Sequence, residues 1–260
     1  MATIGFIGCG KMGCALISSI LKSTNHKIIG SDKSEEYLKN IKKELKIQTT
    51  TDNKELAKRS QIIFLAVKPQ DMSAVLKEIK PEIKNQLIVS IAAGIPMRKI
   101  SVALNHNKII RVMPNTPCLV GAMAAGYSVG DVSQKESQGI KKILSSAGIA
   151  FEVDEEHLDA ITALSGSGPA FFAAFIRHFT DAAAKDGLPK DIALKLACQT
   201  ALGTGKLLLE KNMLPEELIA MVASPGGTTV AGLDVLKKNK FDAILTQTYK
   251  AAVQRSRELA

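Results

Sequence analysis

Apolar runs and helical patterns alternate along the first 153 residues of the chain. Several runs are rich in β-branched residues and are continuous, as is typical of parallel strands that are buried on both faces. These runs are 3–7, 27–30, 61–67, 87–91 and 108–112. The segments 13–22, 35–44 and 71–79 between them are long enough to be helical crossovers. The pattern predicts a doubly wound α/β fold with a mostly parallel sheet.

The pattern changes after about Asp154, where the β-branched runs stop and alanine and leucine dominate. Gly168-Pro169 marks a helix start, since proline at the first turn lacks only an N–H that has no partner there. Gly187 marks the end of that helix, which is apolar on most faces. A helical domain of about 100 residues can hardly bury such a helix alone. We therefore expect residues 1–155 to form the first domain and 156–260 an all-helical domain that packs against a second copy.

Length and composition agree with a globular protein of two domains. The chain has 260 residues, of which 46% are hydrophobic and 23% charged. No continuous apolar run reaches the roughly 18 to 20 residues that span a bilayer. No basic segment and apolar stretch of secretory type stand at the N-terminus. These observations predict a cytoplasmic protein without a membrane span.

Charge and cysteine content narrow the function classes further. The formal net charge is +9, but the lysines are interleaved with acids, and aromatic residues are only 4% of the chain. We therefore expect a solvated basic surface that favours anionic ligands, not a nucleic-acid interface. The four cysteines form no Cys-x-x-Cys pair and have no histidine at zinc-finger spacing. Neither a disulfide framework nor a metal site is predicted.

A glycine-rich turn follows the first predicted strand and opens a helix. When a Gly-x-Gly-x-x-Gly sequence joins a strand to a helix, its first glycine allows a tight turn and its second lets a pyrophosphate approach the backbone. The third glycine allows the helix to pack closely on the strand. The residues are Gly8, Cys9, Gly10, Lys11, Met12 and Gly13. A nucleoside triphosphate loop is excluded, because Met12 stands where that loop needs Ser or Thr for magnesium, and Gly5 would lie within the strand. A dinucleotide is the expected ligand.

The end of the second predicted strand bears on the type of dinucleotide. Asp32 lies 19 residues after Gly13, where a carboxylate binds the adenosine ribose hydroxyls of NAD. Its neighbours Ser31, Lys33 and Ser34 are alternatives that could hold a 2′-phosphate. The choice between NAD and NADP stays open at this point.

Other strand ends carry candidate residues for the nicotinamide side. Ligands of open α/β sheets bind at the carboxyl ends of the strands. Val67, Lys68 and Pro69 follow one strand there, although a Lys-Pro pair is more often just the start of a loop. The strand predicted over 87–91 ends in the small residues from Ser90 to Gly94. After the strand predicted over 108–112, two prolines hold Asn115 in a rigid loop.

The helical half contains one loop with binding chemistry. Residues 224–229 read Ser-Pro-Gly-Gly-Thr-Thr and precede a helical stretch over 230–237. Backbone N–H groups and hydroxyls without charged side chains suit a small carboxylate. The simpler interpretation is a helix N-cap, which needs only one of the threonines.

Taken together, these motifs resemble the pyrroline-5-carboxylate reductase family over essentially the whole chain. The segments that carry the resemblance are 8–13, 67–69, 90–94, 113–117, 164–170 and 224–229. The resemblance implies a Rossmann domain followed by an all-helical dimerisation domain. It also implies a homodimer, and five such dimers can assemble into a decamer. It implies reduction of 1-pyrroline-5-carboxylate to L-proline by NADPH or NADH. Asp32 departs from the family's commonly small or neutral residue, so the usual NADPH preference need not hold.

The resemblance also implies roles for particular residues. The loop 224–229 would bind the carboxylate of the substrate. Thr229 would lie near the imine nitrogen, with Lys68 nearby. Asn53 and Ser31 would contact the cofactor. The residues of the implied substrate site are Ser224, Gly226, Gly227, Thr228 and Thr229, and those of the cofactor site also include Val67, Lys68, Pro69, Ala92, Ala93 and Asn115.

Two other functions fit parts of the pattern. A two-domain hydroxyacid dehydrogenase should carry Lys-x-x-x-Asn on a helix of its second half, yet Glu210 stands four residues after Lys206. A non-catalytic dinucleotide sensor would not need a carboxylate loop. Hydride transfer to a protonated imine needs mainly positioning and exclusion of water, so none of the four histidines is assigned a catalytic role.

Overall fold

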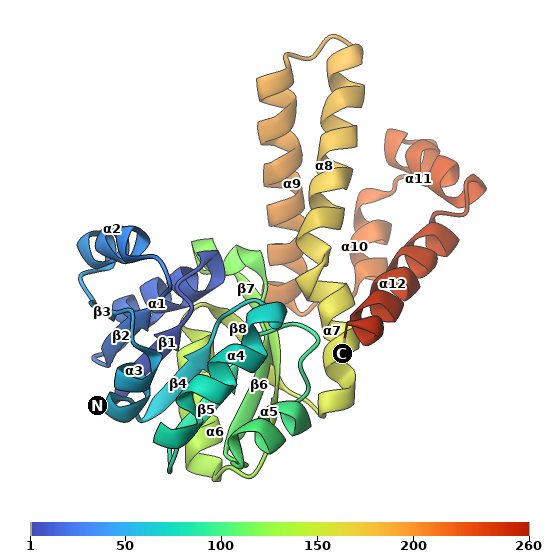
Figure 1. The fold of residues 1–260 in the computed structure, drawn as a ribbon. Coiled ribbons are helices and arrows are strands. Elements are labelled where there is room, and N and C mark those ends of the chain that lie inside the picture. The colour runs from blue at the N-terminus through green and yellow to red at the C-terminus, as the bar shows by residue number, and fades with distance from the viewer. Residues whose placement is uncertain (1, 260) are drawn as a thin grey trace. The chain divides into compact units, whose positions relative to one another are not determined.

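The computed structural model describes residues 2–259, which form two compact units (Figure 1). The first unit runs to Ser167 and also takes in the chain from Ala252 onwards, and the second comprises Gly168–Ala251. The predicted domain boundary between residues 155 and 156 stays a prediction.

The first unit is built on an eight-stranded sheet with strand order β3-β2-β1-β4-β5-β6-β7-β8. All neighbouring strands are parallel except β6 and β7, which are antiparallel. The strands are β1 (Thr3–Ile7), β2 (Lys27–Ser31), β3 (Gln48–Thr50), β4 (Ile62–Leu65), β5 (Leu87–Ser90), β6 (Ile109–Met113), β7 (Met123–Val129) and β8 (Gly148–Glu152). The predicted doubly wound, mostly parallel sheet is confirmed.

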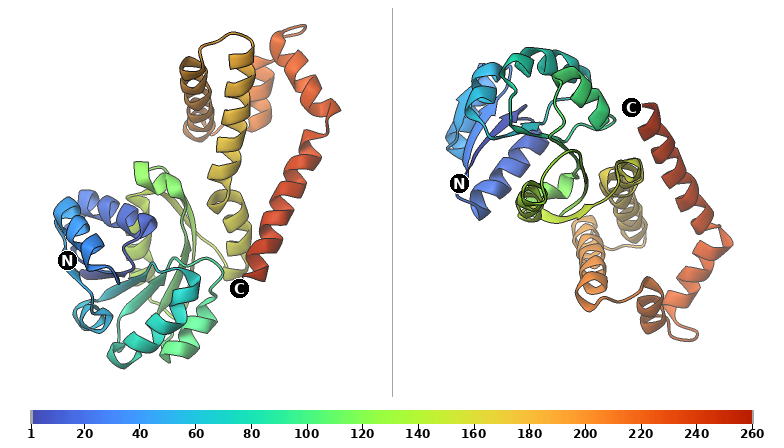
Figure 2. Two further views of the ribbon diagram at one scale, coloured as in Figure 1. Left: turned by 45° about the horizontal axis from the view of Figure 1, so that its top comes forward. Right: turned by 90° about the horizontal axis from the view of Figure 1, so that it is seen from below.

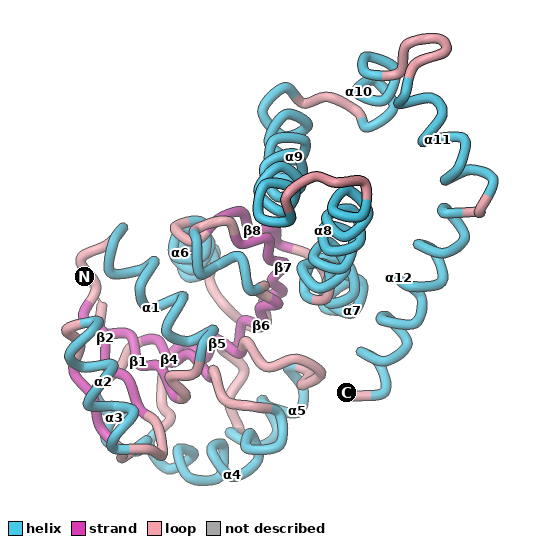
Figure 3. Tube along the Cα trace, turned by 90° about the horizontal axis from the view of Figure 1, so that it is seen from above, coloured by secondary structure: helices cyan, strands magenta, loops and turns pink. Residues whose placement is uncertain are grey.

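Helices cover both faces of this sheet (Figure 3). They are α1 (Lys11–Ser23), α2 (Glu35–Leu45), α3 (Asn53–Arg59), α4 (Pro69–Ile79), α5 (Met97–Leu104) and α6 (Gln134–Ser145). Apolar residues of α1, α2 and α6 pack on one face, around Phe6 and Phe64. Those of α3, α4 and α5 pack on the other, around Ile63 and Leu65. Since consecutive strand residues point to opposite faces, continuous apolar runs supply both cores at once.

The reversal of strand order lies between β1 and β4, from which the chain winds in opposite directions. In open α/β sheets such a reversal leaves a crevice beyond the carboxyl ends of the two strands. Gly8 follows β1 there, and the residues after Leu65 follow β4. The fold therefore places the predicted glycine-rich turn at the position where dinucleotides bind.

A short helix α7 (Leu158–Ile161) and a π-helical turn (Thr162–Gly166) lead into the second unit, which is helical. Its helices are α8 (Gly168–Lys185), α9 (Lys190–Lys211), α10 (Pro215–Val222), α11 (Thr228–Lys238) and α12 (Phe241–Glu258), the last of which ends in the first unit. Gly168-Pro169 does start a helix, and Gly187, with φ +97°, lies just beyond its end. Helices α8 and α9 form an antiparallel hairpin (Figure 2).

Most apolar side chains of α8 and α9 are exposed in the single chain. Phe172 is 68% exposed and Leu209 is 72% exposed. By length and composition alone, the helical stretches Glu155–Lys185 and Lys190–Lys211 are long and apolar enough to cross a membrane. The sequence has no such stretch without charges, but isolated charges such as Arg177 leave these helices apolar on average, so the exclusion of a span from the sequence is too strong. The absence of a membrane partner stays a prediction.

Candidate active site

The glycine-rich turn packs tightly on the sheet at two of its three glycines. Gly8 has φ +93°, and a Cβ there would lie 2.7 Å from the carbonyl oxygen of Ala66. A Cβ on Gly13 would lie 2.6 Å from the carbonyl oxygen of Gly8. A Cβ on Gly10, in contrast, would meet no atom within 4 Å. Gly8 and Gly13 are thus required by packing, whereas Gly10 leaves open space at the helix end.

The N-terminus of α1 is suited to phosphate groups. Gly10 is its N-cap, no side chain accepts a hydrogen bond from the first turn, and that turn contains no acidic residue. The first N–H groups therefore point out of the helix with the positive end of its dipole. Lys11 is exposed beside them, and Met12 packs partly against the core. These features suit a pyrophosphate, and its binding at this turn stays a prediction.

Asp32 lies directly beside this turn. One carboxylate oxygen, Oδ2, accepts a hydrogen bond from the backbone N–H of Cys9 at 3.1 Å, and Oδ1 accepts one from Ser34 N–H at 3.3 Å. Burial, followed by the nearby Cys14 and Asp32, raises the pKa of the Cys9 thiol to about 12. Cys9 is therefore a neutral packing residue, and its contribution to the turn is its backbone N–H.

Ser31 and Asn53 are bonded to each other inside the unit. Ser31 is fully buried, and its hydroxyl donates to Asn53 Oδ1 at 2.6 Å. Asn53 Nδ2 in turn donates to Glu78 Oε2 at 2.8 Å. Both side chains thus brace β2 against α3 and α4, and a contact of either with the cofactor stays a prediction. Glu78 has no motif around it that would have indicated this role.

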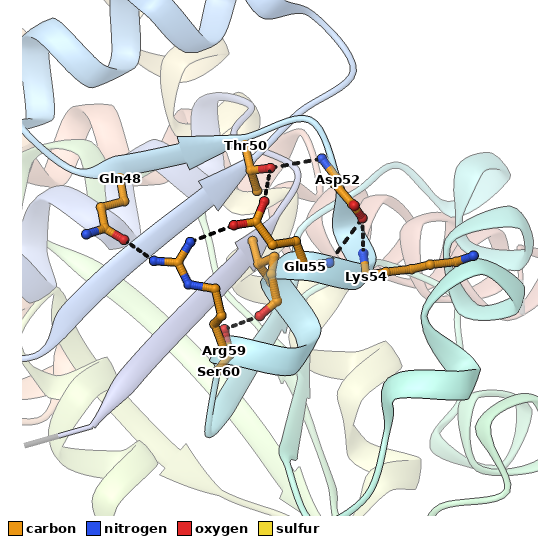
Figure 4. Close-up of polar contacts among 8 residues, drawn as sticks. Gln48, Thr50, Asp52, Lys54, Glu55, Arg59 and Ser60 are labelled. Atoms are coloured by element: carbon orange, nitrogen blue, oxygen red, sulfur yellow. Dashed lines mark hydrogen bonds and ion pairs between the residues drawn. The ribbon is translucent and has the colours of Figure 1, made fainter.

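A polar network fixes the position of α3, which begins at Asn53 (Figure 4). Asp52 caps the helix by accepting hydrogen bonds from the N–H groups of Lys54 and Glu55 at 2.8 and 3.0 Å. Glu55 accepts from the Thr50 hydroxyl at 2.9 Å and from Arg59 Nη1 at 2.7 Å. These bonds, with that of Arg59 to Gln48, hold the helix against β3 and keep Asn53 in register with Ser31.

Lys68 lies at the carboxyl end of β4, as predicted. It is the N-cap of α4, Pro69 occupies the first turn of that helix, and both residues are exposed. Val67 packs partly against the core. The ammonium of Lys68 is therefore free to approach a ligand at this edge of the sheet, although contact with the nicotinamide stays a prediction.

The next two strand ends are shaped by small residues and by Asn115. Ala92 is buried, Ala93 half-buried, and Gly94 has φ +71°. Asn115 is 6% exposed, accepts from Ala124 N–H at 2.9 Å and donates to the Ser165 carbonyl at 3.1 Å. Its side chain therefore ties its loop to β7 and to the π-helical turn. A cofactor contact from Asn115 stays a prediction.

The loop 224–229 of the second unit forms an uncapped helix N-terminus. Gly226 has φ +70°, and Gly227 N–H donates to the Ser224 carbonyl at 2.9 Å, which folds the loop back before α11. Gly227 is the N-cap, no side chain caps the helix, and its first turn contains no acid. The N–H groups of Thr228 and Thr229 thus resemble those that bind carboxylates at helix ends. The residues predicted to bind substrate lie together here, with Thr229 half-buried and Thr228 exposed.

Lys68 belongs to the first unit and Thr229 to the second. Their convergence on one substrate, within a chain or across two chains, stays a prediction. Asp154, Glu156 and His157 lie within ligand distance of one another, but all are exposed and none belongs to the predicted site. The expected lack of a metal also stays a prediction.

Comparisons with known proteins cover the whole chain. A family model for pyrroline-5-carboxylate reductase dimerisation matches residues 155–259, and one for NADP oxidoreductase, coenzyme F420-dependent, matches residues 3–94. The pyrroline-5-carboxylate reductase of Methanosarcina acetivorans is 41% identical over 262 residues, 98% of this chain and 97% of that protein.

Solved structures agree with these matches. A pyrroline-5-carboxylate reductase from Coxiella burnetii matches with a TM-score of 0.94 at 31% identity, over 100% of this chain and 98% of that one. The Plasmodium falciparum pyrroline carboxylate reductase with NADP bound gives 0.89 at 33% identity, over 99% of this chain and 98% of that one. The likeness thus includes both units and both candidate loops.

Proposed function

Because this chain belongs to the pyrroline-5-carboxylate reductase family, we propose that it reduces 1-pyrroline-5-carboxylate to L-proline with NADH or NADPH, the last step of proline biosynthesis. The observation that carries the proposal beyond family membership is the uncapped N-terminus of α11 at the Ser-Pro-Gly-Gly-Thr-Thr loop. It offers a carboxylate two or more backbone N–H groups and no competing acid.

The dinucleotide is proposed to lie across the carboxyl ends of β1 and β4. The N–H groups at the start of α1 would hold the pyrophosphate, with Gly10 allowing close approach. When bound, the reduced nicotinamide supplies a hydride. The small residues Ala92 and Ala93 would let its ring lie close to the backbone, and Lys68 would stand at the rim.

The substrate is proposed to bind through its carboxylate at Thr228 and Thr229 N–H. This orients the ring so that its C=N bond can face the cofactor, which is the main catalytic task for a protonated imine. The Thr229 hydroxyl would hydrogen-bond the ring nitrogen and hold it in place as the nitrogen changes from imine to amine. In this mechanism the chain supplies no metal and no histidine.

The exposed apolar faces of α8 and α9 support a homo-oligomer. Side chains such as Phe172 and Leu209 would be buried against a second copy, which accounts for helices that are as apolar as a membrane span. We propose that the protein is a cytoplasmic homodimer and that five such dimers assemble into a decamer. Neither a membrane nor a nucleic acid is proposed as a partner.

The rival hydroxyacid dehydrogenase is not favoured. Its general acid would need a lysine in a Lys-x-x-x-Asn pair, but Lys206 Nζ lies 3.7 Å from Glu210 Oε1 on the exposed surface of α9. The full-length relatives also carry a different name and activity from that class. A non-catalytic sensor is less consistent with a carboxylate loop that is retained intact.

A matrix of initial rates tests the proposal. The purified chain is given NADH or NADPH with either 1-pyrroline-5-carboxylate or a panel of 2-hydroxy and 2-oxo acids, and dinucleotide oxidation or reduction is followed. Turnover confined to the imine is expected. Turnover of a hydroxyacid alone would favour the rival enzyme, and no turnover with any pair would favour the sensor.

A further inference from the structure

We propose that Asp32 sets the cofactor preference of this chain and that it selects the dinucleotide without a 2′-phosphate, NADH. The inference rests on the proposed function, because it assumes that the dinucleotide binds at the glycine-rich turn. The neighbouring residues that could instead hold a 2′-phosphate are Ser31, Lys33 and Ser34.

The structure places the Asp32 carboxylate where an adenosine ribose would lie. Asp32 directly follows β2, and β2 is the neighbour of β1 in the sheet. Its bond from Cys9 N–H fixes the carboxylate against the turn that would hold the pyrophosphate. Each carboxylate oxygen has a second lone pair, so the group can still accept hydrogen bonds from ribose hydroxyls.

Of the two serines that could have held a 2′-phosphate, Ser31 is fully engaged and Ser34 is partly engaged. Ser31 is fully buried and donates its hydroxyl to Asn53, so it presents no donor to the ligand. Ser34 is the N-cap of α2, and its hydroxyl oxygen accepts a hydrogen bond from Tyr37 N–H at 3.2 Å. Its own N–H donates to Asp32. The Ser31 hydroxyl and the Ser34 N–H are therefore committed elsewhere, whereas the Ser34 hydroxyl, which only accepts in its bond with Tyr37, still has a hydrogen to donate.

The charge around the ribose position is also unfavourable for a phosphate. The segment 32–36 contains three acids, Asp32, Glu35 and Glu36, and one cation, Lys33, so it carries two net negative charges. Both glutamates stand in the first turn of α2, where they neutralise the positive end of that helix. A 2′-phosphate brings about two further negative charges, and at contact distance like charges repel by several times the thermal energy.

Besides the Ser34 hydroxyl, Lys33 is the residue of the segment 32–36 that could favour NADP. Its side chain is exposed, and a lone lysine on a flexible stem is a weak, solvent-screened partner for phosphate. The Asp32 carboxylate is held by the N–H groups of Cys9 and Ser34 before a ligand binds. Its effect on cofactor preference should therefore be larger than that of Lys33.

Binding of two nucleotide probes tests this inference apart from catalysis. ADP-ribose and 2′-phospho-ADP-ribose lack the nicotinamide, so isothermal titration calorimetry with the full chain measures only the adenosine side. We expect the wild type to bind ADP-ribose at least about tenfold more tightly. Equal affinities, or a preference for the phosphorylated probe, would overturn the inference alone. Failure of both probes to bind would overturn the dinucleotide site, and with it the proposed function as well.

Three variants locate the determinant. Asp32→Asn keeps an acceptor for Cys9 N–H but removes the charge, and it should shift the affinity ratio at least about tenfold towards the phosphorylated probe. Glu44→Gln removes the same charge from the far end of α2 and should leave the ratio unchanged. Lys33→Gln should change it less than about threefold. An unchanged ratio in Asp32→Asn, or a larger shift in Lys33→Gln, would contradict the assignment.

Discussion

The guanidinium of Arg111 donates a hydrogen bond to the carboxylate of Glu155 at 3.0 Å, and Glu155 Oε1 also accepts from the N–H of Met97 at 2.7 Å. One carboxylate thus joins the middle of β6, the start of α5 and the segment that leads to α7. Arg111 is 7% exposed, so this pair is largely removed from water. One partner, Arg111, belongs to the strand that precedes the loop of Asn115.

Replacing Glu155 by alanine should destabilise the first unit. The variant leaves Arg111 buried without its counter-charge and removes the acceptor for Met97 N–H, which should cost about 3 kcal/mol of unfolding free energy. Denaturation by urea measures this loss, and Glu156→Ala is the matched control because Glu156 is exposed. Equal stability of the two variants would show that the pair contributes little.

Two alanine substitutions in the glycine-rich turn should separate packing from binding. Gly13→Ala forces a Cβ to within 2.6 Å of a backbone oxygen, so unfolding free energy should fall by about 1 to 3 kcal/mol. Gly10→Ala meets no protein atom and should leave stability unchanged while weakening dinucleotide binding. Thermal unfolding and dinucleotide titration of both variants measure the difference. A Gly10→Ala variant with intact affinity would contradict the proposed pyrophosphate position.

Removing the Thr229 hydroxyl should impair catalysis more than folding. Thr229→Ala is expected to lower kcat/KM for the imine by about 1 to 3 kcal/mol in transition-state terms, the range for a lost hydrogen bond to a charged group. Thr229→Ser should restore most of the activity because it keeps the hydroxyl. Steady-state kinetics with unchanged kcat/KM in Thr229→Ala would remove this residue from the mechanism.

A charge on the exposed face of α8 should break the oligomer. Phe172→Glu would bury a carboxylate in an apolar interface, and the dissociation constant of the dimer should rise at least about a hundredfold. Analytical ultracentrifugation over a range of protein concentrations measures it. Val102→Glu is the control, since Val102 is 71% exposed but lies on α5 of the other unit. An unchanged mass for Phe172→Glu would place the interface elsewhere.

The sequence predicted those strands that are buried on both faces. The sequence runs that form β1, β2, β4, β5 and β6 are continuous and rich in β-branched residues, so their composition alone indicates that they are buried. Strand β7 reads Met-Ala-Ala-Gly-Tyr-Ser-Val and owes its place to pairing with β6, which small residues do not reveal. Strand β3 has three residues and depends on its neighbour β2 in the same way. Helices α3, α5 and α6 are short or strongly polar on one side and were not predicted either.

The candidate site was predictable in position but not in hydrogen bonding. Spacing placed Gly8, Asp32 and Lys68 at strand ends, and parallel topology brought these ends to one edge. The hydrogen bond between Ser31 and Asn53 joins residues 22 positions apart, and that between Asn115 and Ser165 joins residues 50 positions apart. No local pattern encodes such pairs, because they depend on how helices and loops pack in the folded unit.

Transfer of isotope tests the central claim most directly. The chain is incubated with 1-pyrroline-5-carboxylate and NADH or NADPH that carries deuterium at both hydrogen positions of nicotinamide C4, and the product is analysed by mass spectrometry and NMR. The account predicts L-proline with one deuterium on the ring carbon that had been double-bonded to nitrogen. Unlabelled proline, or recovery of the imine unchanged with both cofactors, would contradict it.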